Sequence, residues 1–199
     1  MPITTVYSGS NDGRIESFNA TASTAKAGSS LGTSGTGLIA YTLDGGYTIE
    51  QTFIDFDTTA ITGQIVSATL SLYGDRCGSV ADTVQARLYD YGASITTADY
   101  RTPTQFSACT LLAHLAFTSW SNAAYNAFGD DALAANINKG GHTRIVLCTA
   151  LFAADGTASA VSYLENIQLG GDTNKPKLVI TTANPTFDAR VSRAAYLRM

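Results

Sequence analysis

The two histidines, His114 and His142, are the residues best suited to acid–base chemistry near neutral pH. A catalytic triad needs a nucleophile, a base and an acid that orients the base. His114 lies in a strand-like run without a surrounding motif, and His142 follows two glycines in a turn. The motif HExxH does not occur. The sequence therefore predicts no catalytic histidine.

Two pairs of aspartates could supply the two carboxyl groups of a glycosidase. Asp55 and Asp57 alternate along one predicted strand, so both are expected on its outer face. Asp130 and Asp131 open a predicted helix, where the helix dipole favours negative charge. Solvation and capping explain both pairs without catalysis. We therefore expect no catalytic residues and no enzyme activity.

Metal binding and disulfide bonding have little support in the sequence. Aspartates in Gly-rich turns could bind calcium, but they also bond their own backbone there; these are Asp12, Asp44, Asp155 and Asp172. The cysteines form an odd, widely spaced set without a CxxC pair, namely Cys77, Cys109 and Cys148. We expect free thiols, no metal site and no cofactor.

Three tyrosines fall on the outer rows of predicted strands: Tyr73, Tyr89 and Tyr91. Exposed aromatic rings of this kind could stack on sugars and form a glycan-binding face. The same pattern arises from cross-strand packing within a sheet. Contact with another protein subunit is a third interpretation, and the residues alone do not separate the three.

Composition excludes several classes of partner. The chain has 199 residues, a net charge of −4 and only 14% charged residues. Nucleic-acid binding needs a basic face, so no such partner is expected. No stretch approaches the roughly 20 apolar residues that span a bilayer, so no membrane partner is expected either. The opening MPITTVYSGS lacks the features of a signal peptide, which indicates synthesis in a cytoplasm.

The stretch 51–73 organises the predicted fold. It contains one strand, a connection and a second strand, in which Val66, Ala68, Leu70 and Leu72 alternate with polar residues. Further strands are predicted at 3–7, 84–91, 111–117, 143–148 and 177–182. Residues 20–37 are expected to form a loop, and Asp130–Asn138 one short helix that ends at two glycines.

Short strands with Gly-rich turns at regular spacing predict an all-β fold: a single jelly-roll-like β-sandwich with one short helix. We assign this domain to residues 1–183 and treat residues 184–199 as a separate C-terminal tail. The tail begins near a strand-breaking proline and contains apolar residues that could contact a neighbouring subunit, namely Phe187, Val191, Tyr196 and Leu197. Disorder is the common alternative for such a terminus.

Several strand motifs are similar to those of the DNRLRE-type domain family. The chain reads Phe56-Asp57, then Ile65 to Tyr73, and finally Pro176 to Ile180, which resembles the family's order of strands. This resemblance implies a jelly-roll sandwich of a kind linked to carbohydrate binding in secreted or cell-wall proteins. The charged segment that names the family is not recognisable here, where Tyr163 to Gln168 stands instead.

A closer resemblance is to phage and environmental-virus proteins of this size. It rests on the opening TTVYSGSNDGRI, the corner from Trp120 to Phe128, and the stretch from Ile137 to Arg144. It implies a non-enzymatic structural protein of a virus particle, such as a capsid decoration or a tail or fibre component. Expected partners are other virion proteins, including further copies of this chain, and the expected location is the virion. The alternative is a carbohydrate-binding module that recognises surface glycans.

Overall fold

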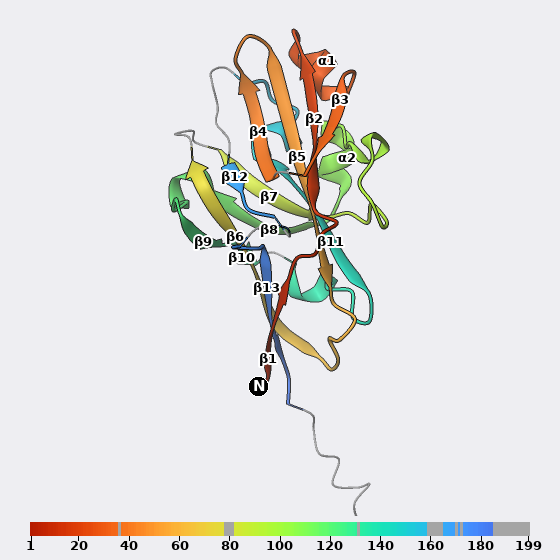
Figure 1. Cartoon of the computed structure of the whole chain (residues 1–199), viewed down its shortest axis with the longest axis vertical. Coiled ribbons are helices and arrows are strands. Elements are labelled where there is room, and N and C mark those ends of the chain that lie inside the picture. The colour runs from red at the N-terminus through yellow and green to blue at the C-terminus, as the bar shows by residue number, and fades with distance from the viewer. Residues whose placement is uncertain are drawn as a thin grey trace, which may run out of the picture.

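A computed structural model describes residues 1–35, 37–77, 82–130, 132–158, 165–169, 171 and 173–184. Antiparallel strands form two sheets that pack face to face, so the predicted all-β sandwich is confirmed (Figure 1). Sheet A contains β1 (Ile3–Tyr7), β6 (Ile65–Cys77), β9 (Ala124–Ala127), β12 (Glu165–Ile167) and β13 (Lys177–Thr182). Sheet B contains β2 (Gly13–Asn19), β3 (Leu31–Ser34), β5 (Tyr47–Asp57), β7 (Thr83–Leu88), β8 (Leu111–Ala116), β10 (Gly129–Asp130) and β11 (His142–Thr149).

Strand β4 (Gly37–Leu43) joins the two sheets. Its first half pairs with β12 and its second half with β5. The core between the sheets is built from alternate residues of both, as the period-2 pattern predicts. It includes Leu70, Leu72, Leu178 and Ile180 from sheet A and Ile54, Phe56, Ile145 and Leu147 from sheet B.

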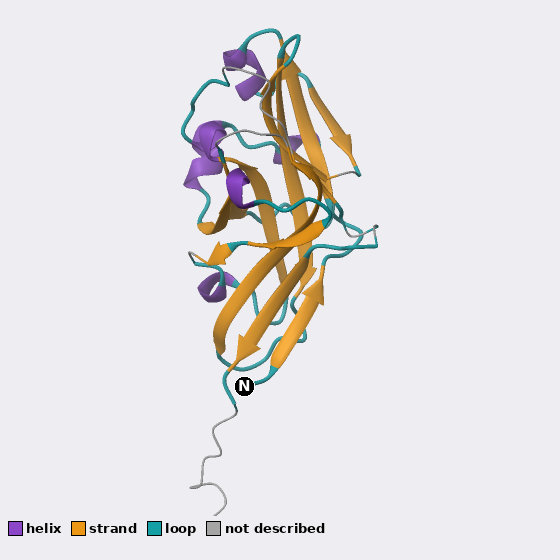
Figure 2. Cartoon of the chain, turned by 90° about the vertical axis from the view of Figure 1, so that its left-hand side faces the viewer, coloured by secondary structure: helices purple, strands orange, loops and turns teal. Residues whose placement is uncertain are grey.

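A second core covers the other face of sheet B. Phe53 and Val146 from the strands pack there with Phe106 and Phe152 from short helices. These helices are α1 (Ala22–Lys26), α2 (Pro103–Ala108) and α3 (Ala150–Ala153). Figure 2 shows helices gathered along one side of the strands. Sheet B is therefore buried on both faces, which explains why eight of the eleven residues of β5 are buried.

The helix content differs from the prediction. We expected residues 20–37 to form a loop, but they contain α1 and β3. The described residues form three short α-helices, where we expected one. Helix α2 begins at Pro103, whose missing N–H costs nothing in the first turn. The Thr102 hydroxyl and the Gln105 side chain cap this turn reciprocally.

The helix expected at Asp130–Asn138 is not formed. Asp130 belongs to β10, and only residues Ala134–Asn136 form a 3₁₀ turn, η3. The other 3₁₀ turns are η1 (Thr97–Asp99) and η2 (Phe117–Ser119). Pairing with β8 and Thr143 takes the backbone groups that a helix would need. Leu133 and Ile137, which are four residues apart, both face the core.

Strand β6 confirms the predicted inward row except at its start. Ala68, Leu70 and Leu72 are buried, whereas Val66 is 49% exposed. The register with β13 shifts between Thr181 and Thr182, opposite Ser67 and Ile65. This irregularity leaves Val66 out of the ladder, and a bulge of that kind redirects side chains.

Candidate binding surfaces

The three tyrosines predicted as one exposed face lie on two different faces. Tyr89 and Tyr91 follow β7 on the outer side of sheet B, where the second core covers them. Tyr91 is only 6% exposed, and its ring stands edge-on to Phe53 with centroids 5.4 Å apart. Burial raises the pKa of Tyr91. The prediction of an exposed Tyr91 is therefore wrong, because the segment after β7 folds back over this sheet.

Tyr89 is held by polar neighbours in the same layer. Its hydroxyl donates to the Asp99 carboxylate (3.0 Å), and the Arg101 guanidinium lies 4.3 Å from the ring centroid. Burial is the main reason that the pKa of Tyr89 is raised to about 12. The Phe53 ring also lies 6.3 Å away, and Tyr89 is half-buried, so its ring packs mainly against the chain itself.

Tyr73 lies on the outer face of sheet A, where it meets two tyrosines that the sequence did not single out. Tyr125 on β9 is directly opposite Tyr73 on β6, with ring centroids 5.4 Å apart at an interplanar angle of 79°. Tyr7 on β1 is opposite Lys177 on β13, and Lys177 is opposite Ser71 on β6. Alternation places all of these side chains on one face. We call Tyr7, Tyr73, Tyr125 and Lys177 the tyrosine face.

The tyrosine face combines exposed rings with a cation. Tyr7 is 55% and Tyr125 36% exposed. The Lys177 ammonium lies 3.8 Å from the centroid of the Tyr125 ring, and the Tyr125 hydroxyl donates to the carbonyl of Lys175 (3.0 Å). Partial burial is the main cause of a raised pKa for Tyr125, so this phenol is neutral at physiological pH. The face can therefore offer aromatic surface, hydroxyl groups and one positive charge.

Sequence periodicity could have found Tyr7 but not Tyr125. Tyr7 ends the strand predicted at 3–7, and β1 confirms that strand. Tyr125 lies in a Ser/Asn-rich corner without a strand pattern. It pairs with β6 because Trp120 and Phe128 anchor the corner in the core.

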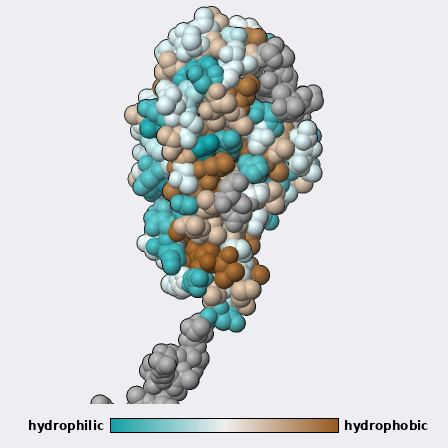
Figure 3. Space-filling model, turned by 180° about the vertical axis from the view of Figure 1, so that it is seen from behind, coloured by the Kyte–Doolittle hydropathy of each residue, from teal (hydrophilic) through white to brown (hydrophobic). Residues whose placement is uncertain are grey.

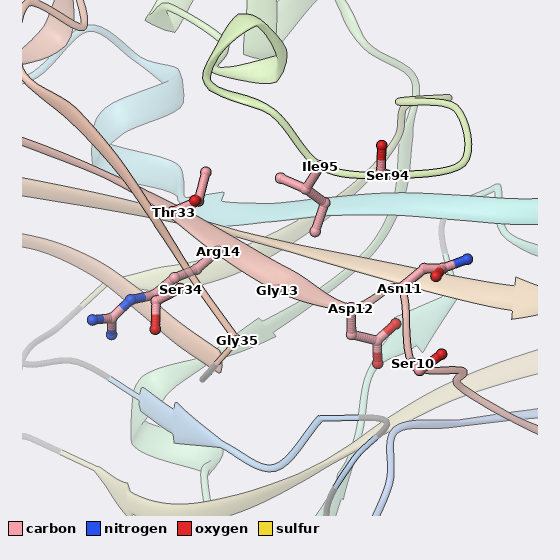
Figure 4. A pocket seen from close by; sticks show the side chains of 10 residues that line it. All are labelled: Ser10, Asn11, Asp12, Gly13, Arg14, Thr33, Ser34, Gly35, Ser94 and Ile95. Carbon is pink, nitrogen blue, oxygen red and sulfur yellow. The ribbon is translucent and has the colours of Figure 1, made fainter.

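A polar pocket of about 310 Å³ lies beside sheet B, between the start of β2, the end of β3 and the loop before η1 (Figure 4). Its walls carry mostly hydroxyl, amide and charged side chains, with Ile95 reaching in from the loop. Its lining residues are Ser10, Asn11, Asp12, Gly13, Arg14, Thr33, Ser34, Gly35, Ser94 and Ile95. A Cβ atom on Gly13 would lie 3.0 Å from both Ile95 and the Ser34 carbonyl, so glycine permits this close approach.

The residues around this pocket serve the fold. The Asp12 carboxylate accepts from the backbone N–H of Asp55 (2.9 Å). Arg14 extends away to Glu50, whose carboxylate oxygen is 2.9 Å from a guanidinium nitrogen. Glu50 is buried, and this desolvation raises its pKa to about 7, although Arg14 opposes the change.

We expected Asp55 and Asp57 on the same exposed face, but the second core buries Asp55 and leaves Asp57 exposed. Asp55 is only 3% exposed and binds His142 Nδ1 at 2.9 Å, with Arg144 Nε at 3.5 Å. Asp57 is exposed and accepts from the backbone and hydroxyl of Thr59, which lowers its pKa. The expectation that Asp55 lies on the surface is therefore wrong, because the covering segment buries it. Its carboxylate acts as an ion-pair partner.

The two histidines are far apart. His114 on β8 is opposite Gln85 on β7, and Gln85 is opposite Cys148 on β11. Cys148 lies six residues from His142 along β11. This separation is about 20 Å along the strand. Among the described residues, no group of three or more His, Cys, Asp or Glu side chains could hold a metal ion. The side chain of Asp130 and the whole of Asp131 lie outside the described part.

Both ends of the described chain meet at the narrow end of the molecule (Figure 1). Thr182 N–H donates to the carbonyl of Pro2 (3.0 Å), and Ala183 N–H donates to Gln64 (2.8 Å). Met1, Ile3 and Val66 are exposed here by 70%, 69% and 49%. Figure 3 shows hydrophobic residues gathered toward this end.

A hollow of about 280 Å³ lies in the same region. It is lined by Pro2, Thr4, Ala60, Ile61, Thr62, Gly63, Thr182 and Ala183. We call this hollow, together with Met1, Ile3 and Val66, the terminal pole. The tail residues predicted as an assembly contact, Phe187, Val191, Tyr196 and Leu197, lie outside the described residues.

No protein-family model matches this chain, and no curated protein matches it either. The described helices include none long and apolar enough to cross a membrane.

Proposed function

We propose that this protein is a non-enzymatic structural component of a virus particle, such as a capsid decoration or a tail or fibre part. It acts by binding other protein surfaces, including further copies of itself, and it is located in the virion. The observation that carries this proposal is the terminal pole, where exposed apolar side chains surround the point at which the tail leaves the sandwich.

The apolar side chains of the terminal pole favour a protein partner. Fully burying a side chain such as Ile3 contributes about 1.5–3 kcal/mol, so three of them supply a useful part of a binding energy. The edge strand β1 strengthens this argument. Its sequence ITTVY contains no charged residue, although exposed edges usually carry charges that prevent pairing.

The tail is the proposed second half of the contact. It starts beside the hollow, because Ala183 both lines the hollow and precedes the tail by one residue. We propose that Phe187, Val191, Tyr196 and Leu197 bind the terminal pole of a neighbouring copy. Exchange of tails between copies would bury the apolar residues of both parts.

A matched pair of variants tests the role of the terminal pole. Ile3→Ser removes an exposed apolar side chain from the pole, and Phe18→Ser removes one that is 45% exposed on β2. Sedimentation velocity should show a smaller assembly or a weaker association only for Ile3→Ser. Equal behaviour of both variants and the parent chain would overturn the proposed contact. Genes for capsid, portal or tail proteins beside this one would support the particle assignment, and their absence would count against it.

Carbohydrate binding is a second candidate function, and the tyrosine face is the observation that favours it. Three tyrosines and a lysine lie on the outer side of sheet A, away from the core. A particle protein could use such a face to recognise surface glycans while the terminal pole holds it in the assembly.

A further inference from the structure

We propose that the tyrosine face binds an oligosaccharide that carries carboxylate groups. This inference rests on the second candidate function and names its site and its class of ligand. The site comprises Tyr7, Tyr73, Tyr125 and Lys177, which come from four adjacent strands in the order β1, β13, β6 and β9. Three strand spacings, about 14 Å, separate the backbones of Tyr7 and Tyr125, so the face suits an oligosaccharide better than a single sugar.

The rings supply the surface on which sugars stack. Tyr73 and Tyr125 stand nearly perpendicular, so one ring presents its face where the other presents its edge. Such a corner can contact the C–H face of a pyranose. The Tyr125 hydroxyl, which donates to the Lys175 carbonyl, can still accept a hydrogen bond from a sugar hydroxyl. Tyr7, more than half exposed at the edge strand, extends the aromatic surface beyond Lys177.

The neighbouring side chains on this face include four with hydroxyl groups, together with the apolar Val179 and Ile3. Thr5 and Ser67 are exposed, and Thr69 and Thr181 are half-buried. All of them belong to the same outward-facing rows as the tyrosines. A sugar's hydroxyl groups can exchange hydrogen bonds with such residues, whereas a protein interface usually needs a more apolar centre.

Lys177 is the reason for choosing an acidic sugar. Within the described part of the chain, no ion pair involves its ammonium group, which lies over the Tyr125 ring. The ring orients the ammonium but neutralises none of its charge. A carboxylate bound beside Tyr125 would complement this charge, and such an attraction weakens as salt is added.

The test uses oligogalacturonate and its carboxyl-reduced, neutral counterpart as paired probes, measured by calorimetry on the full chain. We expect the acidic probe to bind at least tenfold more tightly. Lys177→Gln should remove most of this preference, whereas Tyr7→Ala should weaken binding of both probes. Phe18→Ala is the control, because it removes an exposed aromatic ring far from the site, and its affinities should equal those of the parent chain.

The possible failures are distinguishable. If neither these probes nor a panel of immobilised neutral and acidic oligosaccharides binds the parent chain, carbohydrate binding itself is overturned. If the parent chain binds a probe, and Tyr7→Ala and Lys177→Gln bind it with the same affinity as the parent chain, the proposed site is overturned and carbohydrate binding stands. Tyr7 is exposed on an edge strand, so its replacement should leave the melting temperature unchanged and keep the test interpretable.

Discussion

The indole ring of Trp120 lies directly against the backbone of Gly74. A Cβ atom on residue 74 would come within 2.5 Å of the indole Cε2 atom, so only glycine fits this position of β6. Gly74 is opposite Ala124, one residue beyond the Tyr73–Tyr125 pair. Trp120 also packs edge-on against Phe128 in the core. This contact shows how Trp120 holds β9 and the tyrosine face in place.

Replacing Gly74 by alanine should destabilise the protein. The rigid indole ring cannot move aside cheaply, so we expect a loss of about 1–3 kcal/mol in the free energy of unfolding. Gly32→Ala on β3 is the matched control, because a Cβ atom there meets no other atom within 4 Å. Urea unfolding of both variants checks the prediction. Equal midpoints would contradict the packing described for Trp120.

The two aspartates of β5 should differ strongly when each is replaced by asparagine. Asp55→Asn leaves the partly buried Arg144 and His142 without their shared carboxylate, which should cost about 3 kcal/mol. Asp57→Asn changes an exposed residue whose oxygen still accepts from Thr59, so its effect should stay within about 0.5 kcal/mol. The measurement is the free energy of unfolding in urea at neutral pH. Similar losses for both variants would show that Asp55 has no special structural role.

Glu50 should make stability depend on pH. Burial raises its pKa from 4.5 to about 7, so the folded protein holds this proton more tightly than the unfolded chain does. The stabilisation from this proton is fully present below pH 4.5, the pKa of Glu50 in the unfolded chain. It is lost as the pH rises through about 7, the pKa in the folded protein. This change corresponds to about 3 kcal/mol.

The variant Glu50→Gln lacks this titration and isolates its effect. The free energy of unfolding of the parent chain and of the variant is measured at pH 4.5 and at pH 8. The titration of all other groups is common to both proteins and cancels in the difference. The parent chain should lose stability relative to the variant as the pH rises. A difference that is the same at both pH values would contradict the raised pKa.

The cysteines should react in a fixed order. Cys148 is buried beneath the second core, and burial raises the pKa of its thiol, so it should resist alkylation until the protein unfolds. Cys109 is partly exposed, and a smaller rise of its pKa, again caused mainly by burial, should make it react slowly in the native state. Iodoacetamide labelling followed by peptide mass spectrometry distinguishes the two sites. Native labelling of Cys148 at the rate of Cys109 would show that the second core opens readily.

Much of the sheet framework could be predicted because alternation is a local property. The strand 177–182 has its predicted bounds, and the inward row of β6 follows the predicted alternation from Ala68 to Leu72. Ile54 and Phe56, which alternate with Asp55 and Asp57, lie in the core. The free thiols expected at Cys109 and Cys148 are confirmed.

The burial of Asp55 and Tyr91 could not be predicted from alternation. A period of two indicates that two faces exist, but it does not indicate whether a distant segment covers the second one. Here residues after β7 and the helices α1, α2 and α3 cover it. The same limitation hid the partner of Tyr73, because Tyr125 reaches its position through the tertiary contacts of Trp120. The single predicted helix was also wrong, since pairing with β8 outweighed the helical spacing of Leu133 and Ile137.

The mass of the protein in solution, measured by light scattering, tests the proposed assembly role most directly. The full chain is compared with a version that ends at Ala183 and with a full-length variant in which Phe187, Val191, Tyr196 and Leu197 are serine. We predict a defined oligomer for the full chain and a monomer for both altered versions, with unchanged melting temperatures. A monomeric full chain, or an oligomer that persists without the tail, would contradict the proposal that the tail binds the terminal pole of a neighbouring copy.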